Sequence, residues 1–369
     1  MKKNIIVLFG GKSAEHDISL ITANLVLNAI DEEKYNVYPV FVDKQNKWFY
    51  VKDFKNNIQN FKQKEEIFLK IGEDALFVKR TFLLKNLINV DCAILCHHGV
   101  NGEDGTIQSV LKLCNIPYSS SNTLSSAITM DKVVMKLLFK EFGFNVIDYF
   151  YFNKQEYENS KDNIINKLEN ELNYPVILKP ANLGSSIGIN IAKNKEELIN
   201  AINVAFSFDN KVLVEKALEN FTEINCAVMG YGKEVIVSSL EEPVSWKEFL
   251  TFEDKYEGNS KKSPKRIYPA KVPEEIKKNI QKVSKLIFEK FELCGVVRID
   301  FIIKNDEIYV NEINSIPGSL AYYLFEKEEY SFTNVIDNLI NFALKKYENE
   351  NLLTYAFESN VLKNQNIKK

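Results

Sequence analysis

The chain has 369 residues, of which 45% are hydrophobic and 26% are charged, and its formal net charge is −3. This length exceeds what one simple core accommodates, so two or three domains are expected. The near-neutral charge gives no indication of a nucleic-acid or membrane-surface partner. No apolar run approaches the length of a membrane-spanning helix, and the run near the N-terminus is too short for a signal segment.

Five cysteines at irregular spacing argue against a disulfide framework. Cys92 and Cys96 lie close to His97 and His98, which leaves zinc binding as an alternative. Residues 91–96, however, have the pattern of a buried strand, so packed thiols are the stronger expectation. Together these features predict a reduced, cytoplasmic protein.

Residues 1–121 alternate between strand and helix patterns, which predicts an α/β domain with a doubly wound, mostly parallel sheet covered by helices. The expected strands are 5–9, 36–42, 48–51 and 92–96, and the expected helix is 18–30. Ligands of such sheets collect beyond the carboxyl ends of the strands. Two unusually polar loops, 10–17 and 97–106, are expected at that edge.

Two further α/β units are expected at 122–210 and 211–369. Their predicted elements are a helix at 132–142, strands at 174–179 and 212–215, and a closing helix near 334–347. A Gly-rich loop at 183–188 joins two strands of the second unit. The hydrophilic stretch between 253 and 271 predicts a long loop that acts as a lid.

The segment 295–315 predicts a β-hairpin, because β-branched and aromatic residues flank a polar turn at 305–307. The polar side chains that interrupt its strands are Arg298, Asp300, Glu312 and Asn314. Since side chains alternate along a strand, a three-residue turn places Asp300 opposite Glu312 and Arg298 opposite Asn314. A slip of one residue would separate both pairs.

Facing carboxylates repel each other, so a cation is expected between Asp300 and Glu312. With the amide oxygen of Asn314 they form an all-oxygen ligand set, which suits Mg²⁺ shared with a nucleotide phosphate. The alternative is a pair of ordinary salt bridges to Arg298 and a nearby lysine. The hairpin by itself leaves both interpretations open.

The Gly-rich loop 183–188 follows a strand that ends at Lys179. Glycine lets backbone N–H groups approach a phosphate closely, and serine hydroxyls add donors. A flexible hairpin turn is an equally good interpretation of the loop, which matches no standard nucleotide fingerprint. A desolvated lysine is costly without an anion, so Lys179 favours a phosphate contact.

Three charged or polar positions have open interpretations. Glu215 and Lys216 end an apolar strand, where the backbone can read an adenine edge or the charges can simply be solvated. Glu15 begins a helix and either favours its dipole or holds a substrate ammonium. His98 is either a site residue or a structural histidine bonded to a backbone carbonyl.

In this order, the motifs resemble the ATP-grasp superfamily and, within it, the D-alanine–D-alanine ligase family. The resemblance covers about residues 4–345. The motifs that carry it are Gly10-Gly-x-Ser-Ala-Glu-His16, His98-Gly-x-x-Gly-Glu-Asp-Gly-Thr-Ile-Gln108, Met130-Asp-Lys132, Lys179-Pro-Ala-Asn-Leu-Gly-Ser-Ser186, Arg298-Ile-Asp300 and Asn311-Glu-Ile-Asn-Ser-Ile-Pro-Gly318. It implies three domains with ATP gripped between the second and third.

The resemblance also implies the nucleotide and metal contacts. The implied phosphate ligands are Lys132, Lys179, Ser186 and, in the lid, Lys255. The implied adenine and ribose ligands are Glu215, Lys216, Leu218 and Glu223. Two Mg²⁺ (or Mn²⁺) ions are implied at Asp300, Glu312 and Asn314.

For the substrates, the resemblance implies that Glu15 binds the ammonium of the first D-alanine in a site shared with His98. Glu15, Ser185 and Tyr256 would form a hydrogen-bonded set that closes the lid, and Arg298 would stabilise the tetrahedral intermediate. The implied reaction is ATP-dependent ligation of two D-alanines through an acyl phosphate, for peptidoglycan precursor synthesis. A homodimer is implied as well.

One motif departs from the family. After Pro317-Gly318 the family has a serine that holds the carboxylate of the second substrate, and here Tyr323 takes that place while Leu324 is retained. A ligase that joins D-alanine to D-serine or another small acceptor is therefore an alternative. A non-catalytic ATP-binding protein and a grasp enzyme with unrelated substrates are further alternatives.

Overall fold

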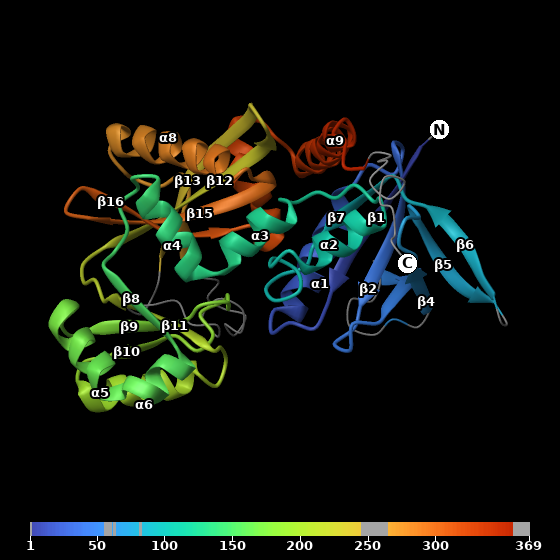
Figure 1. Cartoon of the computed structure of the whole chain (residues 1–369). Helices are drawn as coiled ribbons and strands as arrows, with labels where there is room; N and C mark the ends of the chain where they lie inside the picture. Colours follow the sequence, from blue (N-terminus) through green and yellow to red (C-terminus); the bar gives the residue numbers. More distant parts are fainter. Residues whose placement is uncertain (1, 55–60, 62–63, 81–82, 245–264, 357–369) are drawn as a thin grey trace, which may run out of the picture.

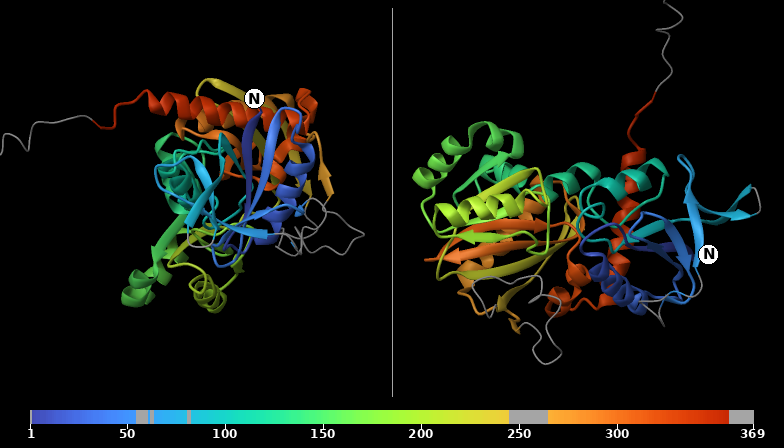
Figure 2. Two further views of the ribbon diagram at one scale, coloured as in Figure 1. Left: turned by 90° about the vertical axis from the view of Figure 1, so that its right-hand side faces the viewer. Right: turned by 90° about the horizontal axis from the view of Figure 1, so that it is seen from below.

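The computed structural model describes residues 2–54, 61, 64–80, 83–244 and 265–356. Within these residues the strands form three sheets (Figure 1). The first sheet lies to one side of the other two, and the right-hand view in Figure 2 shows the same separation. No described helix is both long and apolar enough to cross a membrane.

The first sheet has seven strands in the order β6-β5-β4-β3-β2-β1-β7. The strands are β1 (Lys3–Gly10), β2 (Tyr35–Val42), β3 (Trp48–Val51), β4 (Lys64–Leu69), β5 (Ala75–Arg80), β6 (Leu83–Asn89) and β7 (Cys92–Leu95). The α/β class is confirmed, but the parallel part is smaller than predicted. Only β2, β1 and β7 run parallel, and β3 to β6 add an antiparallel extension that the sequence pattern did not reveal.

Strand β1, which lies between β2 and β7 in the parallel part of the sheet, is an unbroken apolar run because both of its faces are buried. Every residue of β1 from Ile5 to Phe9 is fully buried, as expected for a parallel strand between covering layers. The predicted helix after it is α1 (His16–Ala29), and α2 (Thr106–Leu113) follows β7. The loops after β1 and β7 therefore meet at one edge of the sheet, as predicted.

The second sheet is antiparallel, with strands in the order β10-β9-β11-β8. Its elements are β8 (Tyr149–Asn153), α5 (Lys154–Glu171), β9 (Val176–Pro180), β10 (Asn190–Ala192), α6 (Lys195–Ala205) and β11 (Lys211–Lys216). Leu178, Val212 and Val214 pack with α5 and α6 on one face. Because side chains alternate, Lys179 and Glu215 are on the opposite face, which is turned toward the rest of the molecule.

The third sheet is also antiparallel, in the order β14-β13-β12-β15-β16. Its strands are β12 (Thr222–Tyr231), β13 (Glu234–Val244), β14 (Lys265–Ile267), β15 (Cys294–Lys304) and β16 (Glu307–Asn314). The helices around it are α3 (Thr123–Met130), α4 (Lys132–Glu141), α8 (Glu274–Lys290), the 3₁₀ helix η2 (Gly318–Glu328) and α9 (Phe332–Asn351). The stretch predicted as a loop at 253–271 contains β14, and its part up to 264 lies outside the described residues.

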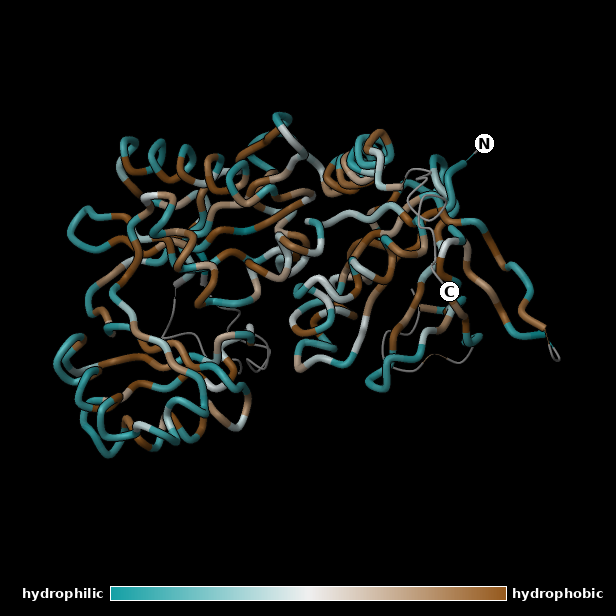
Figure 3. The backbone as a smooth tube through the Cα atoms, viewed as in Figure 1, coloured by the Kyte–Doolittle hydropathy of each residue, from teal (hydrophilic) through white to brown (hydrophobic). Residues whose placement is uncertain are grey.

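Alternate residues of β12 belong to two different hydrophobic cores. Cys226 and Val228 pack with α4 and α8, whereas Ala227 and Met229 belong to the core that continues into the first sheet. Helix α9 contacts β7, β12 and β15 and so joins the first and third sheets (Figure 1). In Figure 3 the apolar segments follow the strands and the hydrophilic ones follow the outer loops.

The predicted domain limits of 1–121, 122–210 and 211–369 stay a proposal. The packing points to different assignments for two segments. Met135 and Phe139 of α4 belong to the core of the third sheet, although they fall within the predicted second unit. Strand β11, at the start of the predicted third unit, pairs with β8 and β9 of the second sheet.

The β15–β16 hairpin has the predicted pairing, with Arg298 opposite Asn314 and Asp300 opposite Glu312. The predicted three-residue turn is wrong, because Lys304 pairs with Glu307 and the turn has two residues. A bulge next to Asp300 restores the register that the shorter turn would have shifted by one residue. The side chains thus reach the predicted positions by a different backbone route.

Both turn residues of this hairpin, Asn305 and Asp306, have positive φ angles of 50° and 64°. Two such residues are typical of a two-residue hairpin turn, in which Gly is favoured at the second position. We therefore expect Asp306→Gly to raise the free energy of unfolding by about 0.5–1 kcal/mol. Asp306→Val should lower it by at least about 1 kcal/mol, since a β-branched residue is strained there. Urea unfolding measures both, and equal stability of the two variants would contradict this turn geometry.

Candidate active site

A cavity of about 450 Å³ lies where the polar loops of the first sheet meet the hairpin of the third sheet and the Gly-rich loop. Nine of the side chains predicted for the site line it: Glu15, His98, Ser185, Glu223, Arg298, Asp300, Glu312, Asn314 and Tyr323. They come from sequence segments nearly 300 residues apart, since Glu15 follows β1 and Asn314 ends β16. The volume is within the range of small-molecule sites.

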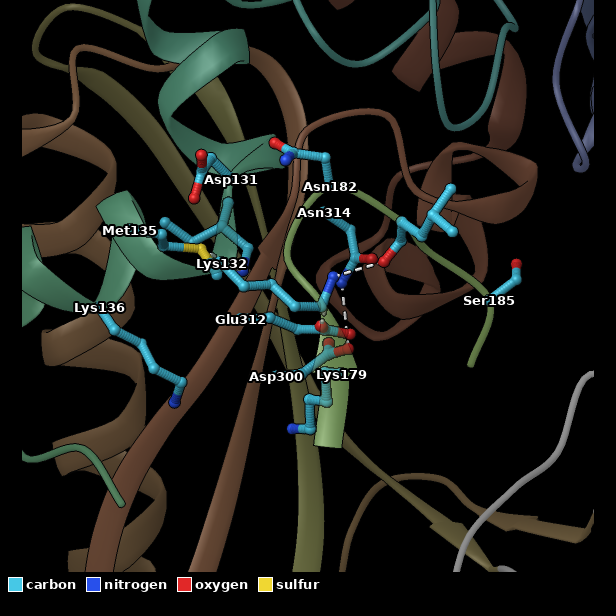
Figure 4. A network of polar contacts seen from close by, with 12 residues as sticks. Asp131, Lys132, Met135, Lys136, Lys179, Asn182, Ser185, Asp300, Glu312 and Asn314 are labelled. Atoms are coloured by element: carbon cyan, nitrogen blue, oxygen red, sulfur yellow. Dashed lines mark hydrogen bonds and ion pairs between the residues drawn. The ribbon is translucent and has the colours of Figure 1, made fainter. Parts of the chain in front are cut away.

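Positive side chains already neutralise the two carboxylates of the hairpin. The Arg298 Nε and Nη2 atoms each donate to an oxygen of Asp300 at 2.7 Å, and Asn314 Nδ2 donates to the same carboxylate at 3.0 Å. Lys132 Nζ lies 3.8 Å from Glu312 Oε2. Figure 4 shows Lys132, Asp300, Glu312 and Asn314 close together. The salt-bridge alternative therefore describes this structure, with Lys132 as the lysine.

The electrostatics of Arg298 follow from this geometry. Burial alone would lower its pKa, but the adjacent Asp300 carboxylate outweighs burial and raises the pKa of Arg298 well above its usual value. Arg298 is therefore a permanent cation that faces the cavity. Such a fixed positive group stabilises negative charge that develops on a substrate oxygen.

The hairpin also offers the donor set for a divalent cation, namely two carboxylates and one amide oxygen on a single face. In the part of the chain that the structure describes, no group of three or more His, Cys, Asp or Glu side chains forms a complete metal cage. Mg²⁺ is usually held by one or two carboxylates and completed by substrate phosphates and water. The residues present therefore fit a nucleotide-bound cation.

A buried charge cluster joins the second sheet to helix α4. Glu215 is fully buried, and its two carboxylate oxygens lie 2.6 Å from Lys136 Nζ and 2.5 Å from Lys179 Nζ. The interpretation of Glu215 as a solvated charge at a strand exit is therefore wrong. Lys136 was missed in the sequence, where its place among apolar residues of a helix was the available signal.

The three charges of this cluster shift one another's pKa values. Burial would raise the pKa of Glu215, but Lys136 and Lys179 outweigh it and lower the pKa to about 2. Burial lowers the pKa of Lys136, with a smaller contribution from Lys179 in the same direction. For Lys179, the attraction of Glu215, Glu312 and Glu223 outweighs burial, and its pKa is raised. Lys179 is thus held as a cation close to the cavity.

This cluster limits which atoms of the predicted adenine ligands are free to contact a nucleotide. The Glu215 side chain is enclosed and paired with lysines, and its backbone is paired with Tyr149 and Ile177 of the neighbouring strands. Lys216 is exposed and Leu218 is half-buried on the segment that follows. The backbone N–H of Lys216 already donates to Asp148 O at 3.0 Å, which leaves fewer donors for a base than the sequence suggested.

The Gly-rich loop contacts the first-sheet loop directly. Ser185 Oγ donates a hydrogen bond to Glu15 Oε1, which links two of the three members of the predicted lid set. A Cβ on Gly184 would lie 3.1 Å from Glu15, so glycine permits this close approach. Ser185 and Ser186 both have left-handed φ angles, 51° and 58°, which are uncommon outside glycine.

Lys132 and Asn182 fix the same loop from its other side. Lys132 Nζ donates to Leu183 O at 2.6 Å, and the backbone N–H of Asn182 donates to Asp209 at 2.7 Å. The strained serines are therefore held by contacts at the start of the loop. Backbone strain that is held in place by surrounding contacts is common in ligand-binding loops.

His98 is a buried histidine with a partner on each ring nitrogen. Its Nδ1 lies 2.8 Å from Ile316 O, and its Nε2 lies 2.8 Å from Thr22 Oγ1. A carbonyl can only accept, so Nδ1 carries the proton and Thr22 donates to Nε2. Burial lowers the pKa of His98, which agrees with a neutral ring. His98 thus has the backbone-carbonyl contact of the structural interpretation and also lines the cavity, so its predicted role in the substrate site stays a prediction.

Glu103 is a site residue that the sequence analysis quoted within a motif but did not assign. Its carboxylate accepts hydrogen bonds from the backbone N–H groups of Gly99 at 2.8 Å and Ile316 at 2.9 Å. It therefore connects the loop after β7 to the loop after β16. Burial raises the pKa of Glu103 to about 8, and the neighbouring Glu15 acts in the same direction.

The far end of the cavity surrounds Tyr323. Its hydroxyl donates to Glu241 Oε2 at 3.2 Å, and the Arg266 guanidinium lies 4.3 Å from its ring centre. Burial raises the pKa of Tyr323 to about 12. Leu324, by contrast, has a fully buried side chain in the core, and its carbonyl accepts a hydrogen bond from the Tyr268 hydroxyl. The predicted substrate role of Leu324 stays a prediction.

The remaining predictions have different outcomes. Lys255 and Tyr256 lie outside the described residues. The five cysteines are free and buried, as expected for packed thiols. The cavity residues that the sequence analysis did not assign to the site include Glu103, Asn225, Glu241 and Arg266. Asn225, Glu241 and Arg266 come from strands with no motif, so only the fold could identify them.

A cavity lined by paired carboxylates on a hairpin, with Lys132 beside one of them, is the arrangement expected of an ATP-grasp enzyme. A model of the D-ala D-ala ligase N-terminus matches residues 4–121, and a model of the D-ala D-ala ligase C-terminus matches residues 138–341. The chain therefore belongs to the D-alanine–D-alanine ligase family.

Individual relatives extend over nearly the whole chain. A D-alanine–D-alanine ligase of Thermosipho melanesiensis is 43% identical and covers 98% of each chain, and that of Thermosipho africanus is 41% identical over 97% and 98%. The structure of the D-alanine–D-alanine ligase from Coxiella burnetii has a TM-score of 0.81 at 26% identity, covering 95% and 96%. The VanG D-Ala:D-Ser ligase of Enterococcus faecalis has the same TM-score at 30% identity, covering 93% and 100%.

The buried cluster generates a stability prediction. Glu215→Gln removes the nearest counter-charge of both Lys136 and Lys179, so we expect the free energy of unfolding to fall by about 3–5 kcal/mol. The exposed Glu219→Gln is the matched control and should change it by no more than about 0.5 kcal/mol. Urea unfolding at pH 7 measures both.

The pH dependence provides a second measurement on the same variants. Because the folded pKa of Glu215 is depressed, its contribution is present above the ordinary value of 4.5 and is lost as the pH falls toward 2. The difference between the wild type and Glu215→Gln should therefore shrink over that interval. Equal stability of the two proteins at pH 7 would contradict the charge cluster.

Proposed function

We propose that this cavity joins two D-alanine molecules in an ATP-dependent, ADP-forming reaction that supplies a peptidoglycan precursor. Family membership makes the chain a ligase that uses ATP and small amino-acid substrates. The single observation that supports the site best is the pairing of Asp300 with Glu312 beside Arg298 and Lys132. It combines the ligands for a nucleotide-bound cation with permanent positive charge.

The first step is transfer of the terminal phosphoryl group of ATP to the carboxylate of the first D-alanine, which gives an acyl phosphate and ADP. Lys132 and Lys179 are the proposed phosphate ligands, with Ser186 on the Gly-rich loop and Lys255 in the lid. Their charges offset the negative charge on the transferred group. Lys179 keeps its proton because Glu215 holds its pKa high.

The second step is attack of the amine of the second D-alanine on the acyl carbon, followed by loss of phosphate. Glu15 is the proposed ligand of the first ammonium, and Ser185 orients it through the observed hydrogen bond. Arg298 is the proposed stabiliser of the negative oxygen in the tetrahedral intermediate. Its bidentate contact with Asp300 fixes the guanidinium in advance of the reaction.

The other predicted residues are proposed to position the substrates and to close the site. His98 is neutral and hydrogen-bonded on both nitrogens, so we assign it the task of positioning the loops around the first substrate. Lys216, Leu218 and the backbone of Glu215 are proposed to border the adenine, and Glu223 the ribose. Tyr256, with Lys255, is proposed to close over the substrates and exclude water from the acyl phosphate.

Asp300, Glu312 and Asn314 are proposed to hold two Mg²⁺ ions, or Mn²⁺. When bound, such ions neutralise phosphate charge and align the nucleotide. Arg298 and Lys132 contact the same carboxylates in this structure. The carboxylates keep further lone pairs after these contacts, because each can accept about four hydrogen bonds.

A ligase that uses D-serine as the second substrate is the second candidate function. It is supported by the similarity to a D-Ala:D-Ser ligase structure, whereas Tyr323, at the position where the family usually has a serine, argues against it. Tyr323 sits between Glu241 and Arg266, so it forms a bulky wall of the proposed acceptor site. A bulky wall favours the smaller D-alanine over D-serine.

Assembly and location are proposed on separate grounds. A homodimer formed through the first domain is expected from the family resemblance, and mass photometry at nanomolar to micromolar concentration tests it. The cytoplasm is the expected compartment because the substrate is ATP and the five buried cysteines are free thiols. The predicted three-domain division is tested by limited proteolysis of the full chain.

Removing one proposed metal ligand tests the reaction most directly. We expect Asp300→Asn to lower kcat by at least about a hundredfold, because a preorganised charged group at the reacting phosphate is lost. Asp306→Asn on the turn of the same hairpin is the matched control and should keep the wild-type rate. A coupled assay of ADP release with D-alanine and Mg·ATP measures both. An unaltered rate in Asp300→Asn would contradict the proposed metal-binding role of the Asp300 carboxylate.

Substitutions at Tyr323 distinguish the two candidate acceptors. The wild type should form D-alanyl-D-alanine, and Tyr323→Ser should raise kcat/KM for D-serine relative to D-alanine by about tenfold or more, since space and a hydroxyl are gained. Tyr323→Phe keeps the ring and serves as the control with little change in that ratio. Mass spectrometry of the products across an acceptor panel gives the result. Predominant D-alanyl-D-serine from the wild type would establish the second candidate.

A further inference from the structure

Two arginines face an active-site cavity whose other charged walls are acidic. Among the described residues that line it, the acidic side chains are Glu15, Glu103, Glu223, Glu241, Asp300 and Glu312, and the cationic ones are Arg266 and Arg298. Arg298 is engaged in its bidentate contact with Asp300. Arg266, in contrast, is used by neither step of the proposed reaction, so its function is open.

The register of the third sheet places Arg266 on the cavity face. One row of that face consists of Glu312, Asp300, Asn225 and Glu241, which are direct neighbours across β16, β15, β12 and β13. Arg266 of β14 pairs with Pro243, which lies two residues after Glu241 and therefore on the same face. Arg266 thus lies at the edge of the sheet opposite the proposed metal ligands.

A ring and a carboxylate hold the Arg266 guanidinium. It lies 4.3 Å from the centre of the Tyr323 ring, and its Nη1 lies 3.7 Å from Glu241 Oε1. This ion pair is longer than a hydrogen bond, so it does not occupy an N–H donor of the guanidinium. The side chain is also 54% exposed. Arg266 is therefore positioned and still able to bind a ligand.

The Tyr323 hydroxyl, in contrast, has already given its proton to a partner. It donates to Glu241 Oε2 at 3.2 Å, and Asn225 Nδ2 donates to the same oxygen at 3.3 Å. Burial and the charge of Glu241 raise the pKa of Tyr323 to about 12, so the phenol stays protonated. A phenol has one proton to donate, and here Glu241 accepts it. The hydroxyl therefore does not supply a donor to a substrate carboxylate.

The chemistry of the second substrate requires such a donor. Its amine attacks the acyl carbon, whereas its own carboxylate does not react and has to be held between acidic walls. A carboxylate in that position is costly without a cation beside it. Arginine suits this task because its planar group can donate two parallel hydrogen bonds to one carboxylate.

We propose that Arg266 binds the carboxylate of the second amino acid and so selects acceptors with a free carboxylate over uncharged amines. Tyr323 and Glu241 position its guanidinium. The inference rests on the proposed function, because it concerns the acceptor of that reaction.

The test compares D-alanine with D-alaninamide, which has the amine but lacks the carboxylate. D-Alaninamide has no group that ATP can phosphorylate, so it enters the reaction as the acceptor alone. Both acceptors compete for the same acyl phosphate. At a fixed ratio of the two, the yields of D-alanyl-D-alanine and D-alanyl-D-alaninamide by mass spectrometry therefore give the ratio of their kcat/KM values.

We expect the wild type to prefer D-alanine and Arg266→Gln to reduce this preference at least about tenfold, because a charge-assisted contact with one acceptor is lost. Arg266→Lys keeps the charge without the planar group and should be intermediate. Lys271→Gln, exposed and outside the cavity lining, is the matched control and should keep the wild-type ratio. The ratio does not depend on the amount of active enzyme, so a partly unfolded variant still decides the matter.

Tyr323→Phe separates the ring from the hydroxyl. It keeps the ring beside the guanidinium, so the preference for D-alanine should persist. Loss of the preference in Tyr323→Phe but not in Arg266→Gln would assign the carboxylate to the phenol and overturn the proposal.

Two further outcomes separate this inference from the proposed function. An unchanged product ratio in Arg266→Gln, whether or not the total rate falls, would reduce Arg266 to a structural contact and overturn the inference alone. If the wild type forms neither D-alanyl product, the proposed function fails and the inference fails with it.

Discussion

The register of the β15–β16 hairpin is the constraint on which the active site depends. Two carboxylates directly opposite each other are unfavourable in a sheet, and this pairing persists because Arg298 and Lys132 offset the charge. A shift of one residue would turn Glu312 and Asn314 to the core face and bury them unpaired. The bulge next to Asp300 keeps the register despite a turn shorter than expected. The backbone irregularity therefore preserves the positions of the side chains that do the chemistry.

Charge is arranged in layers around this hairpin. Arg298 and Lys132 contact the carboxylates directly, and Lys179 is maintained as a cation by the buried Glu215 behind it. Glu215 also pairs with Lys136, so the same carboxylate fixes α4 against the second sheet. Because the cluster is enclosed, its geometry does not depend on solvent. Stability and the positioning of phosphate ligands thus rest on one group.

The first domain contributes to the site through loops that are tied to the third sheet by hydrogen bonds. Glu103 accepts from Ile316, His98 donates to the same residue, and Ser319 donates to Thr22. The substrate loops therefore have little freedom relative to the hairpin.

Local sequence patterns predict much of this organisation. The apolar runs predicted β1, β2, β3 and β7, and the alternation of polar residues in the hairpin predicted which carboxylates would face each other, because the period of a strand is two residues. The motifs in chain order were specific enough to indicate the family. These features depend on residues that are close together in the sequence, so their pattern can be recognised without the fold.

Contacts between distant segments were decided by the tertiary structure alone. Lys136 and Glu215 are separated by 79 positions, and nothing in either segment indicates that they pair at 2.6 Å. The assignment of α4 to the third sheet, the antiparallel extension of the first sheet and the positions of Asn225, Glu241 and Arg266 in the cavity are similar cases. Each depends on which faces pack together, and that choice is made by the total burial of apolar surface over the whole chain rather than by any local preference.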